Sequence, residues 1–263
     1  MLTFLKLGGS LITDKTSPYT AHPERIERLA AEIATALRAD PELQLVLGHG
    51  SGSFGHQAAS RFDTRSGVST PEEWRGFAEV WYQASALNRL VVEALHRAGL
   101  PVITIAPCSS ITAHDGKVLV WDLYALQTAL AHGLIPVIHG DVVLDDFRGG
   151  TILSTEDLFA HLGPLLHPQR ILLAGLEPGV WKQFPARNTL ITDLSPASLA
   201  QDLAAPGQAA GSDVTGGMQA KVTQMLTLVG QVNGLEVLIF SGETPGNVLR
   251  ALQGENPGTR LHR

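Results

Sequence analysis

The sequence predicts an α/β fold in which a mainly parallel central sheet carries helices on both faces. Short apolar runs without in/out alternation, typical of strands buried on both faces, alternate with amphipathic stretches of helical length along almost the whole chain. Every glycine-rich segment follows such a run, at the sheet edge where α/β proteins bind their ligands. With 263 residues, 44% of them hydrophobic, the chain can bury a sizeable core.

The apolar runs and periodic stretches give the elements in order. We expect strands over residues 2–7, 43–47, 102–105, 135–138, 170–174 and 236–240. We expect helices over residues 22–39, 71–98, 123–132, 155–167, 217–232 and 245–252. Two apolar runs around a polar turn predict a hairpin over 141–153, and the last ten residues suit a loose end or a short edge strand. The stretches 176–192 and 204–216, which contain Pro and Gly, predict loops over a ligand.

Charge and cysteine content exclude several kinds of partner. The chain has 19 Lys and Arg against 25 Asp and Glu, a net charge of −6 and no basic run, so we expect no nucleic acid and no membrane as partner. Cys108 is the only cysteine, which excludes an intramolecular disulfide and a cysteine-based zinc site and favours a reducing compartment. No signal peptide or membrane span is visible, so we expect a cytoplasmic protein.

Two glycine-rich segments have the chemistry of phosphate cradles. Lys6-Leu7-Gly8-Gly9-Ser10 and Gly48-His49-Gly50-Ser51-Gly52-Ser53-Phe54-Gly55-His56 each follow a predicted strand, and small residues there let backbone N–H groups approach an anion. Lys6 and Lys15 bring two ammonium groups to the first turn, as phosphoryl transfer requires, and His56 adds a donor at the mouth of the second. Taken alone, the first segment is more often a tight turn with solvated lysines, and a lone histidine such as His56 is more often structural.

Further along the chain, three residues follow or open predicted elements at the same sheet edge. Lys221 lies in the first turn of the helix that follows the segment 213–217, an arrangement suited to the β and γ phosphates of a nucleotide. Asp141 follows an apolar strand and is placed to orient the two lysines of the first turn, or to hold magnesium through water. Ser154 has the position of a helix N-cap. The plainer alternatives are an exposed lysine on an ordinary capped helix and a turn aspartate.

An apolar stripe on the helix 71–98 consists of Phe77, Trp81, Ala84 and Val91. Most such stripes pack into the core, but an acceptor with a hydrocarbon tail would have its pocket here.

The run 50–55 also matches the dinucleotide-binding fingerprint, which makes an NAD-dependent oxidoreductase the rival from another class. The match is poor, because Glu72 and Glu73, about 20 residues further on, open a helix instead of ending a second strand. Neither a Walker A loop nor a His-Arg-Asp catalytic loop is present, so those phosphotransferase classes are excluded.

Taken in order, four segments resemble the amino acid kinase superfamily and, within it, the isopentenyl phosphate kinases. They are Lys6 to Ser10, Gly48 to His56, Pro136-Val137-Ile138-His139-Gly140-Asp141-Val142, and Asp213-Val214-Thr215-Gly216-Gly217-Met218 with Lys221. The resemblance spans nearly the whole chain. Its most specific part is Gly-Ser-Phe-Gly-His, because relatives that act on carboxylates lack that histidine.

The resemblance implies an open three-layer αβα sandwich, the amino acid kinase fold, as one domain over 1–263. It implies an acceptor-binding lobe at 1–165, a nucleotide-binding lobe at 166–263, ATP with Mg²⁺, a small-molecule phosphate as acceptor, and a homodimer. Carried over by position, catalytic roles fall to Lys6, Lys15, His56, Asp141 and Lys221, with Asp141 organising the lysines. Nucleotide contacts fall to Lys6, Gly8, Gly9, Ser10, Gly175, Gly179, Trp181, Gly216 and Lys221. Acceptor contacts fall to Gly50, Ser51, Gly52, Gly55, His56 and Ser154, and no residue is assigned as a metal ligand.

Two segments depart from the family pattern. Gly175-Leu176-Glu177-Pro178-Gly179-Val180-Trp181 replaces an Asp-Val-Asp-Gly-Val-Tyr-like segment, and Ser154-Thr155-Glu156-Asp157 replaces a Ser-Gly-Asp-Asp-like run. A kinase of another small phosphate or phosphonate, such as fosfomycin, is the alternative within the fold. A non-catalytic nucleotide sensor or the oxidoreductase is the alternative outside it.

Overall fold

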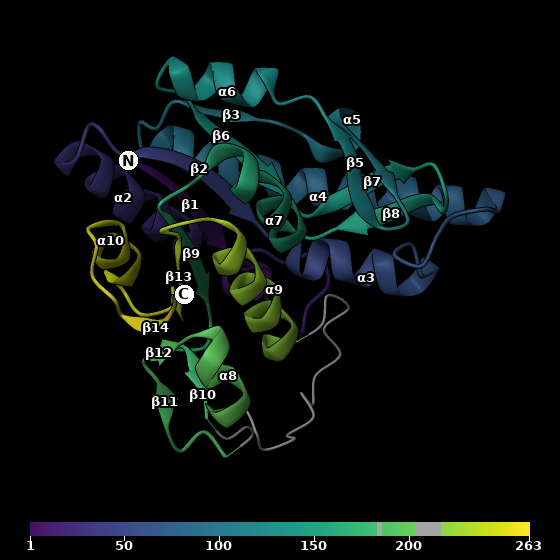
Figure 1. Cartoon of the computed structure of the whole chain (residues 1–263). Helices are drawn as coiled ribbons and strands as arrows, with labels where there is room; N and C mark the ends of the chain where they lie inside the picture. The colour runs from purple at the N-terminus through teal and green to yellow at the C-terminus, as the bar shows by residue number, and fades with distance from the viewer. Residues whose placement is uncertain (183–185, 203–216) are drawn as a thin grey trace.

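The computed structural model describes residues 1–182, 186–202 and 217–263. Its main sheet has eight strands in the order β12-β14-β13-β9-β1-β2-β6-β3 (Figure 1). The six strands expected from the sequence are adjacent and parallel, which confirms the mainly parallel sheet, and within this sheet the described antiparallel pair is β13 with β14. The strands are β1 (Leu2–Leu7), β2 (Gln44–His49), β3 (Val102–Thr104), β6 (Ile135–His139), β9 (Arg170–Gly175), β12 (Asp193–Leu194), β13 (Glu236–Ser241) and β14 (Gly258–Leu261).

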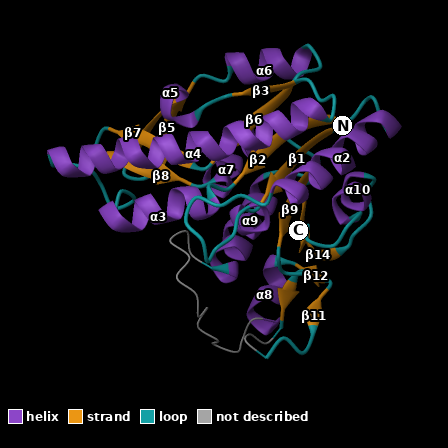
Figure 2. Ribbon diagram, turned by 180° about the vertical axis from the view of Figure 1, so that it is seen from behind, coloured by secondary structure: helices purple, strands orange, loops and turns teal. Residues whose placement is uncertain are grey.

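Helices cover both faces of this sheet (Figures 1 and 2). One face carries α2 (Pro23–Ala39), α4 (Pro71–Arg97) and α10 (Asn247–Leu252), and the other carries α6 (Tyr124–Ala131), α7 (Thr155–Leu166) and α9 (Met218–Gln231). No described helix is long and apolar enough to cross a membrane.

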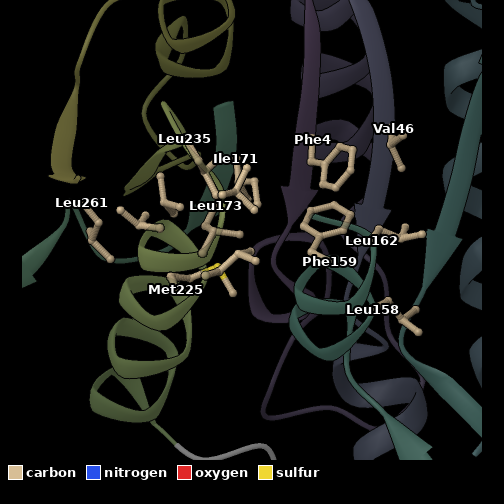
Figure 3. Packing of buried hydrophobic residues seen from close by; sticks show 14 of the residues in the cluster. Phe4, Val46, Leu158, Phe159, Leu162, Ile171, Leu173, Met225, Leu235 and Leu261 are labelled. Carbon is tan, nitrogen blue, oxygen red and sulfur yellow. The ribbon is translucent and has the colours of Figure 1, made fainter. Parts of the chain in front are cut away.

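The central strand β1 sends alternate side chains to the two faces. Figure 3 shows Phe4 packed on Phe159 of α7, and the two ring centroids are 5.0 Å apart, whereas Leu5 belongs to the cluster that includes α2 and α4. Because side chains alternate along a strand, Lys6 shares the face of Phe4 and points toward α7.

A second sheet, in the order β5-β4-β7-β8, continues from the end of β6. The hairpin expected over 141–153 is confirmed as the antiparallel pair β7 (Asp141–Asp145) and β8 (Gly149–Leu153). The sequence reasoning missed β4 (Ile111–His114) and β5 (Lys117–Trp121) because they are four and five residues long and a bulge interrupts their pairing.

Several expected loops contain regular structure. The stretch 176–192 includes the antiparallel pair β10 (Val180–Trp181) and β11 (Leu190–Ile191). The C-terminal strand β14 lies inside the main sheet, because β12 pairs along its outer side. The sequence analysis also missed the short helices α1 (Gly9–Ile12), α3 (Gly52–Phe62), α5 (Pro107–Ser110) and α8 (Pro196–Asp202). Of these, α1 and α3 begin inside the glycine-rich segments. The stretch 204–216 lies outside the described residues.

The apolar stripe expected on α4 divides between two environments. Val91 packs in the core cluster with α2, and Phe77 lies in a separate small cluster with Ala58 and Ala59 of α3. Trp81 is 45% exposed, so its place in the stripe was wrong.

Candidate active site

The two predicted phosphate loops touch each other backbone to backbone. They follow β1 and β2, which are parallel neighbours with Leu7 opposite His49. A Cβ atom on Gly9 would lie 2.5 Å from the Gly52 nitrogen, and one on Gly50 would lie 2.8 Å from the Gly9 nitrogen. Both distances are too short for any side chain, so the contact requires glycine at positions 9 and 50. We call this contact the glycine seam, and it consists of Gly8, Gly9, Gly50, Ser51 and Gly52.

The glycine seam presents unpaired hydrogen-bond donors. In the part of the chain that the structure describes, the backbone N–H groups of Gly9, Ser10, Ser51 and Gly52 donate to no other protein atom. The residues that follow are paired, since Leu11 N–H donates to Gly8 O and Ser53 N–H donates to Thr13 Oγ1. Four free donors from two adjoining loops are the arrangement that binds an anion such as phosphate.

Lys6 and Lys221 meet at one carboxylate beside the glycine seam. Glu156, in the first turn of α7, forms an ion pair with Lys6, and its Oε1 lies 3.4 Å from Nζ of Lys221 on α9. Burial alone would raise the pKa of Glu156, but the Lys6 and Lys221 charges outweigh it and lower the pKa to about 2. Glu156 is therefore ionised and holds two cations from separate elements in one place.

This arrangement corrects the role expected of Asp141. Its Oδ1 accepts a hydrogen bond from Val142 N–H, and its Oδ2 lies 3.5 Å from His139 Nε2, so it pairs with neither Lys6 nor Lys15. The reason is strand alternation, because His139 shares the face of Val137, which packs with α2 and α4. Asp141 lies on that side of the sheet, away from Lys6.

Glu156 was not singled out from the sequence. Two signals could have identified it: it lies in the first turn of a helix that follows a strand end, and Lys6 shares the α7 face by its two-residue spacing from Phe4.

The structure places the remaining expected acceptor residues around α3. His56 is half-buried in the second turn of α3, so it lies on a helix and not in the loop where the sequence reasoning put it. Gly55 is needed for packing, because a Cβ there would lie 2.2 Å from Ser51 Oγ. Lys15 is exposed in the loop after α1 and makes no ion pair with a described residue.

Ser154 caps α7 as expected. Its Oγ accepts from Asp157 N–H, and Asp157 Oδ2 accepts from both the hydroxyl and the N–H of Ser154. Asp157 also accepts a hydrogen bond of 3.0 Å from Gln224 of α9 and lies 3.6 Å from Arg65. The first turn of α7 thus joins α9 to the loop before α4.

The expected nucleotide residues lie at the end of β9 and beyond. Gly175 ends β9, and its carbonyl accepts from Gly242 N–H. Gly179 packs against β14, where a Cβ would lie 2.5 Å from Thr259 Oγ1, and Trp181 donates its indole N–H to Glu177. Gly216 lies outside the described residues.

Comparison with known proteins identifies the family to which this chain belongs. The amino acid kinase family model matches residues 1–241. The chain is 34% identical to the isopentenyl phosphate kinase of Methanothermobacter thermautotrophicus and 32% identical to that of Methanocaldococcus jannaschii, over 99% of this chain and 98% of each relative. A solved isopentenyl phosphate kinase superposes with a TM-score of 0.84 at 32% identity, over 99% of this chain and 100% of the other. A substrate complex of such a kinase superposes with a TM-score of 0.78 at 25% identity, over 99% of both chains.

This chain belongs to the amino acid kinase family and, within it, groups with the isopentenyl phosphate kinases. Its fold is the amino acid kinase fold, and it is a phosphotransferase, as the sequence predicted.

Proposed function

We propose that this enzyme transfers the γ-phosphoryl group of ATP to isopentenyl phosphate and so forms isopentenyl diphosphate and ADP. The observation that carries the proposal is the glycine seam with its free N–H donors, flanked by Lys6 and Lys221 on their shared Glu156. The full-length likeness to isopentenyl phosphate kinases supports the choice of acceptor.

The transfer needs alignment and charge neutralisation, and it needs no general base. An acceptor phosphate oxygen forms a bond to the γ-phosphorus while the bond from that phosphorus to the β–γ bridging oxygen breaks. A phosphate monoester has a second pKa of about 6, so the attacking oxygen carries its negative charge at neutral pH. Two anions must approach each other, and the lysine ammonium groups and free N–H donors reduce their repulsion.

The lysines act on the transferring group from the α7 face of the sheet. Glu156 fixes Lys6 and Lys221 together before substrates bind, so their positive charge is preorganised. Lys15 lies in an exposed loop. Its catalytic role stays a prediction, since that role requires the loop to approach the transferring phosphate.

The acceptor lies on the α3 side of the glycine seam in this proposal. His56 binds its phosphate, together with backbone groups of the loop from Gly50 to Gly55 and the α7 terminus at Ser154. The small apolar cluster next to His56 suits the hydrocarbon tail, since it contains Ala58 and Ala59 of α3, Phe77 and Val80 of α4, and Val142 of β7.

The nucleotide lies over the C-terminal half, from the seam toward Gly175, Gly179 and Trp181. Among the described residues no group of three or more metal-ligating side chains occurs, so this part of the chain offers no ready-made protein cage for Mg²⁺. Magnesium bound through substrate phosphates is the common arrangement in kinases, and we assign it no protein ligand. The homodimer, the two-lobe division near residue 165 and the cytoplasmic location stay parts of this proposal.

The test is a panel of acceptors offered to the purified protein with ATP and Mg²⁺, with ADP release as the readout. Isopentenyl or dimethylallyl phosphate should give the highest kcat/KM. Faster turnover of fosfomycin or of a nucleoside monophosphate would reject the proposed acceptor. Failure to release ADP with any acceptor would favour a nucleotide sensor.

A further inference from the structure

His49 is a buried imidazole with two fixed ring contacts. It ends β2, is 1% exposed, and stacks on His139 with ring centroids 5.3 Å apart and planes 8° apart. Its Nδ1 lies 3.1 Å from the Gly50 carbonyl oxygen, and its Nε2 lies 3.1 Å from Oδ1 of Asn88 on α4. Burial, and next the neighbouring His139, lower the pKa of His49 to about 4, so the ring is neutral at neutral pH.

A neutral ring has one N–H, and its position follows from the contacts. Both ring nitrogens face oxygen atoms, Gly50 O and Asn88 Oδ1, but a backbone carbonyl can only accept, whereas an amide side chain can turn over and present its NH₂. We therefore place the proton on Nδ1, where it is donated to Gly50 O. As placed, Asn88 turns its Oδ1 toward Nε2 and donates from Nδ2 to Thr104 Oγ1. With the ring proton on Nδ1, this amide turns over, so that its NH₂ donates to Nε2 and its oxygen accepts from the Thr104 hydroxyl. This chain of contacts runs from α4 to the glycine seam without a net charge.

The hydrogen bond fixes the orientation of one peptide group. The Gly50–Ser51 peptide is planar and trans, so its C=O and N–H point in opposite directions. With the Gly50 oxygen held inward by His49, the Ser51 N–H points away from the ring, and it is one of the free donors of the glycine seam.

The backbone before this peptide is held independently. The His49 carbonyl accepts from Gly140 N–H at 3.0 Å and from Thr155 Oγ1 at 2.6 Å, and Gly50 N–H donates to Leu7 O at 3.0 Å. Between these bonds and the start of α3 at Gly52, the partner of the Gly50 oxygen among the described residues is the His49 ring. Glycine at position 50 leaves this peptide free to rotate unless something holds it.

We propose that His49 is a positioning residue, which orients the Gly50–Ser51 peptide so that the Ser51 N–H donates to the phosphate being transferred. The inference rests on the proposed phosphoryl transfer and adds a residue that acts through the backbone and touches no substrate itself.

Two substitutions at this one position separate the two ring contacts. In His49→Asn the amide nitrogen occupies the place of Nδ1 and keeps the donor to Gly50 O. In His49→Gln the amide reaches the place of Nε2, keeps a contact to Asn88, and loses the Nδ1 donor. Both variants bring an amide into the same buried space, so the unfolding midpoint in urea is expected to fall in both.

The kinetic readout is the split between kcat and KM. Because an oriented backbone donor contributes about 100- to 1000-fold when it is removed outright, His49→Gln should lower kcat about 10- to 100-fold with KM for ATP unchanged. His49→Asn should stay within about threefold of the wild type. Equal loss in the two variants, or loss confined to KM for ATP, would overturn the inference.

A second measurement needs neither variant nor turnover. In a ¹⁵N-labelled wild-type protein, the Ser51 amide proton should shift downfield on saturation with inorganic phosphate or with isopentenyl phosphate. A Ser51 resonance that stays in place while those of Gly9 and Ser10 move would overturn the inference. Lack of turnover with isopentenyl phosphate, with the Ser51 shift intact on inorganic phosphate, would count against the proposed acceptor alone.

Discussion

The two faces of the main sheet present different chemistry at the same strand ends. On the face covered by α7 and α9, Lys6, Glu156 and Lys221 form a cluster of charges. On the face covered by α4, the neutral ring of His49 stacks on His139 and bonds to a backbone carbonyl. The two faces therefore have different roles: charged groups act on the phosphate from one face, and a neutral group orients the glycine seam from the other. Because the His49 ring is neutral, it does not compete with the phosphate for the lysine ammonium groups.

The largest effect should come from the charged face. Lys6→Met removes a buried cation beside the glycine seam and should lower kcat about 100- to 1000-fold, because that charge opposes the repulsion between two phosphates. Steady-state kinetics with ATP and isopentenyl phosphate measure it.

The double variant Lys6→Met/Glu156→Gln controls for stability. Removing Lys6 alone leaves Glu156 buried with Lys221 as its remaining described cation, so the single variant should unfold at lower urea than the double variant. The double variant should recover stability without recovering kcat. Recovery of both would mean that Lys6 acts through folding.

A matched pair of carboxylate substitutions tests whether the lysines depend on Glu156 or on Asp141. Glu156→Gln should lower kcat about 10- to 100-fold, because the two lysines lose their shared anchor. Asp141→Asn should change kcat less than about threefold, because Asp141 touches neither lysine. The reverse order of effects would restore to Asp141 the organising role expected from the sequence.

The smallest effect is a difference in how the two faces respond to acid. The pKa of Glu156 is lowered from 4.5 to about 2, so its contribution to stability is present above pH 4.5 and is lost as pH falls toward 2. The pKa of His49 is lowered from 6.5 to about 4, so the unfolded chain binds the extra proton and stability falls between pH 6.5 and 4.

Urea unfolding at a series of pH values measures both windows. The stability difference between wild type and Glu156→Gln should shrink between pH 4.5 and 2, and His49→Asn should flatten the wild-type slope between pH 6.5 and 4. A single common window for both variants would contradict the separation of the two faces.

The sequence was sufficient for the parallel sheet, the main helices and the place of the glycine loops. Those features follow from runs of buried apolar residues and from the rule that loops at parallel strand ends meet at one edge. The contact between Gly9 and Gly52 depends on the distance and register between two neighbouring strands. The spacing of residues along the sequence does not give that distance.

The Asp141 error has a specific cause. Both Asp141 and Glu156 lie near the correct sheet edge, but edge position does not say which face a side chain takes. Counting in steps of two along β1 places Lys6 with Phe4 and toward α7, and that step would have selected Glu156. The short strands β4 and β5 could not be found in this way, because exposed residues such as Leu119 and Val120 obscure their pattern.

The most direct test of the account is a crystal structure with a non-hydrolysable ATP analogue and isopentenyl phosphate. We expect the γ-phosphate and the acceptor phosphate to meet at the glycine seam, with the N–H groups of Gly9 and Ser51 as donors and Lys6 and Lys221 as flanking cations. Phosphates bound away from the seam, or a nicotinamide-type ligand lying along residues 50–56, would contradict it.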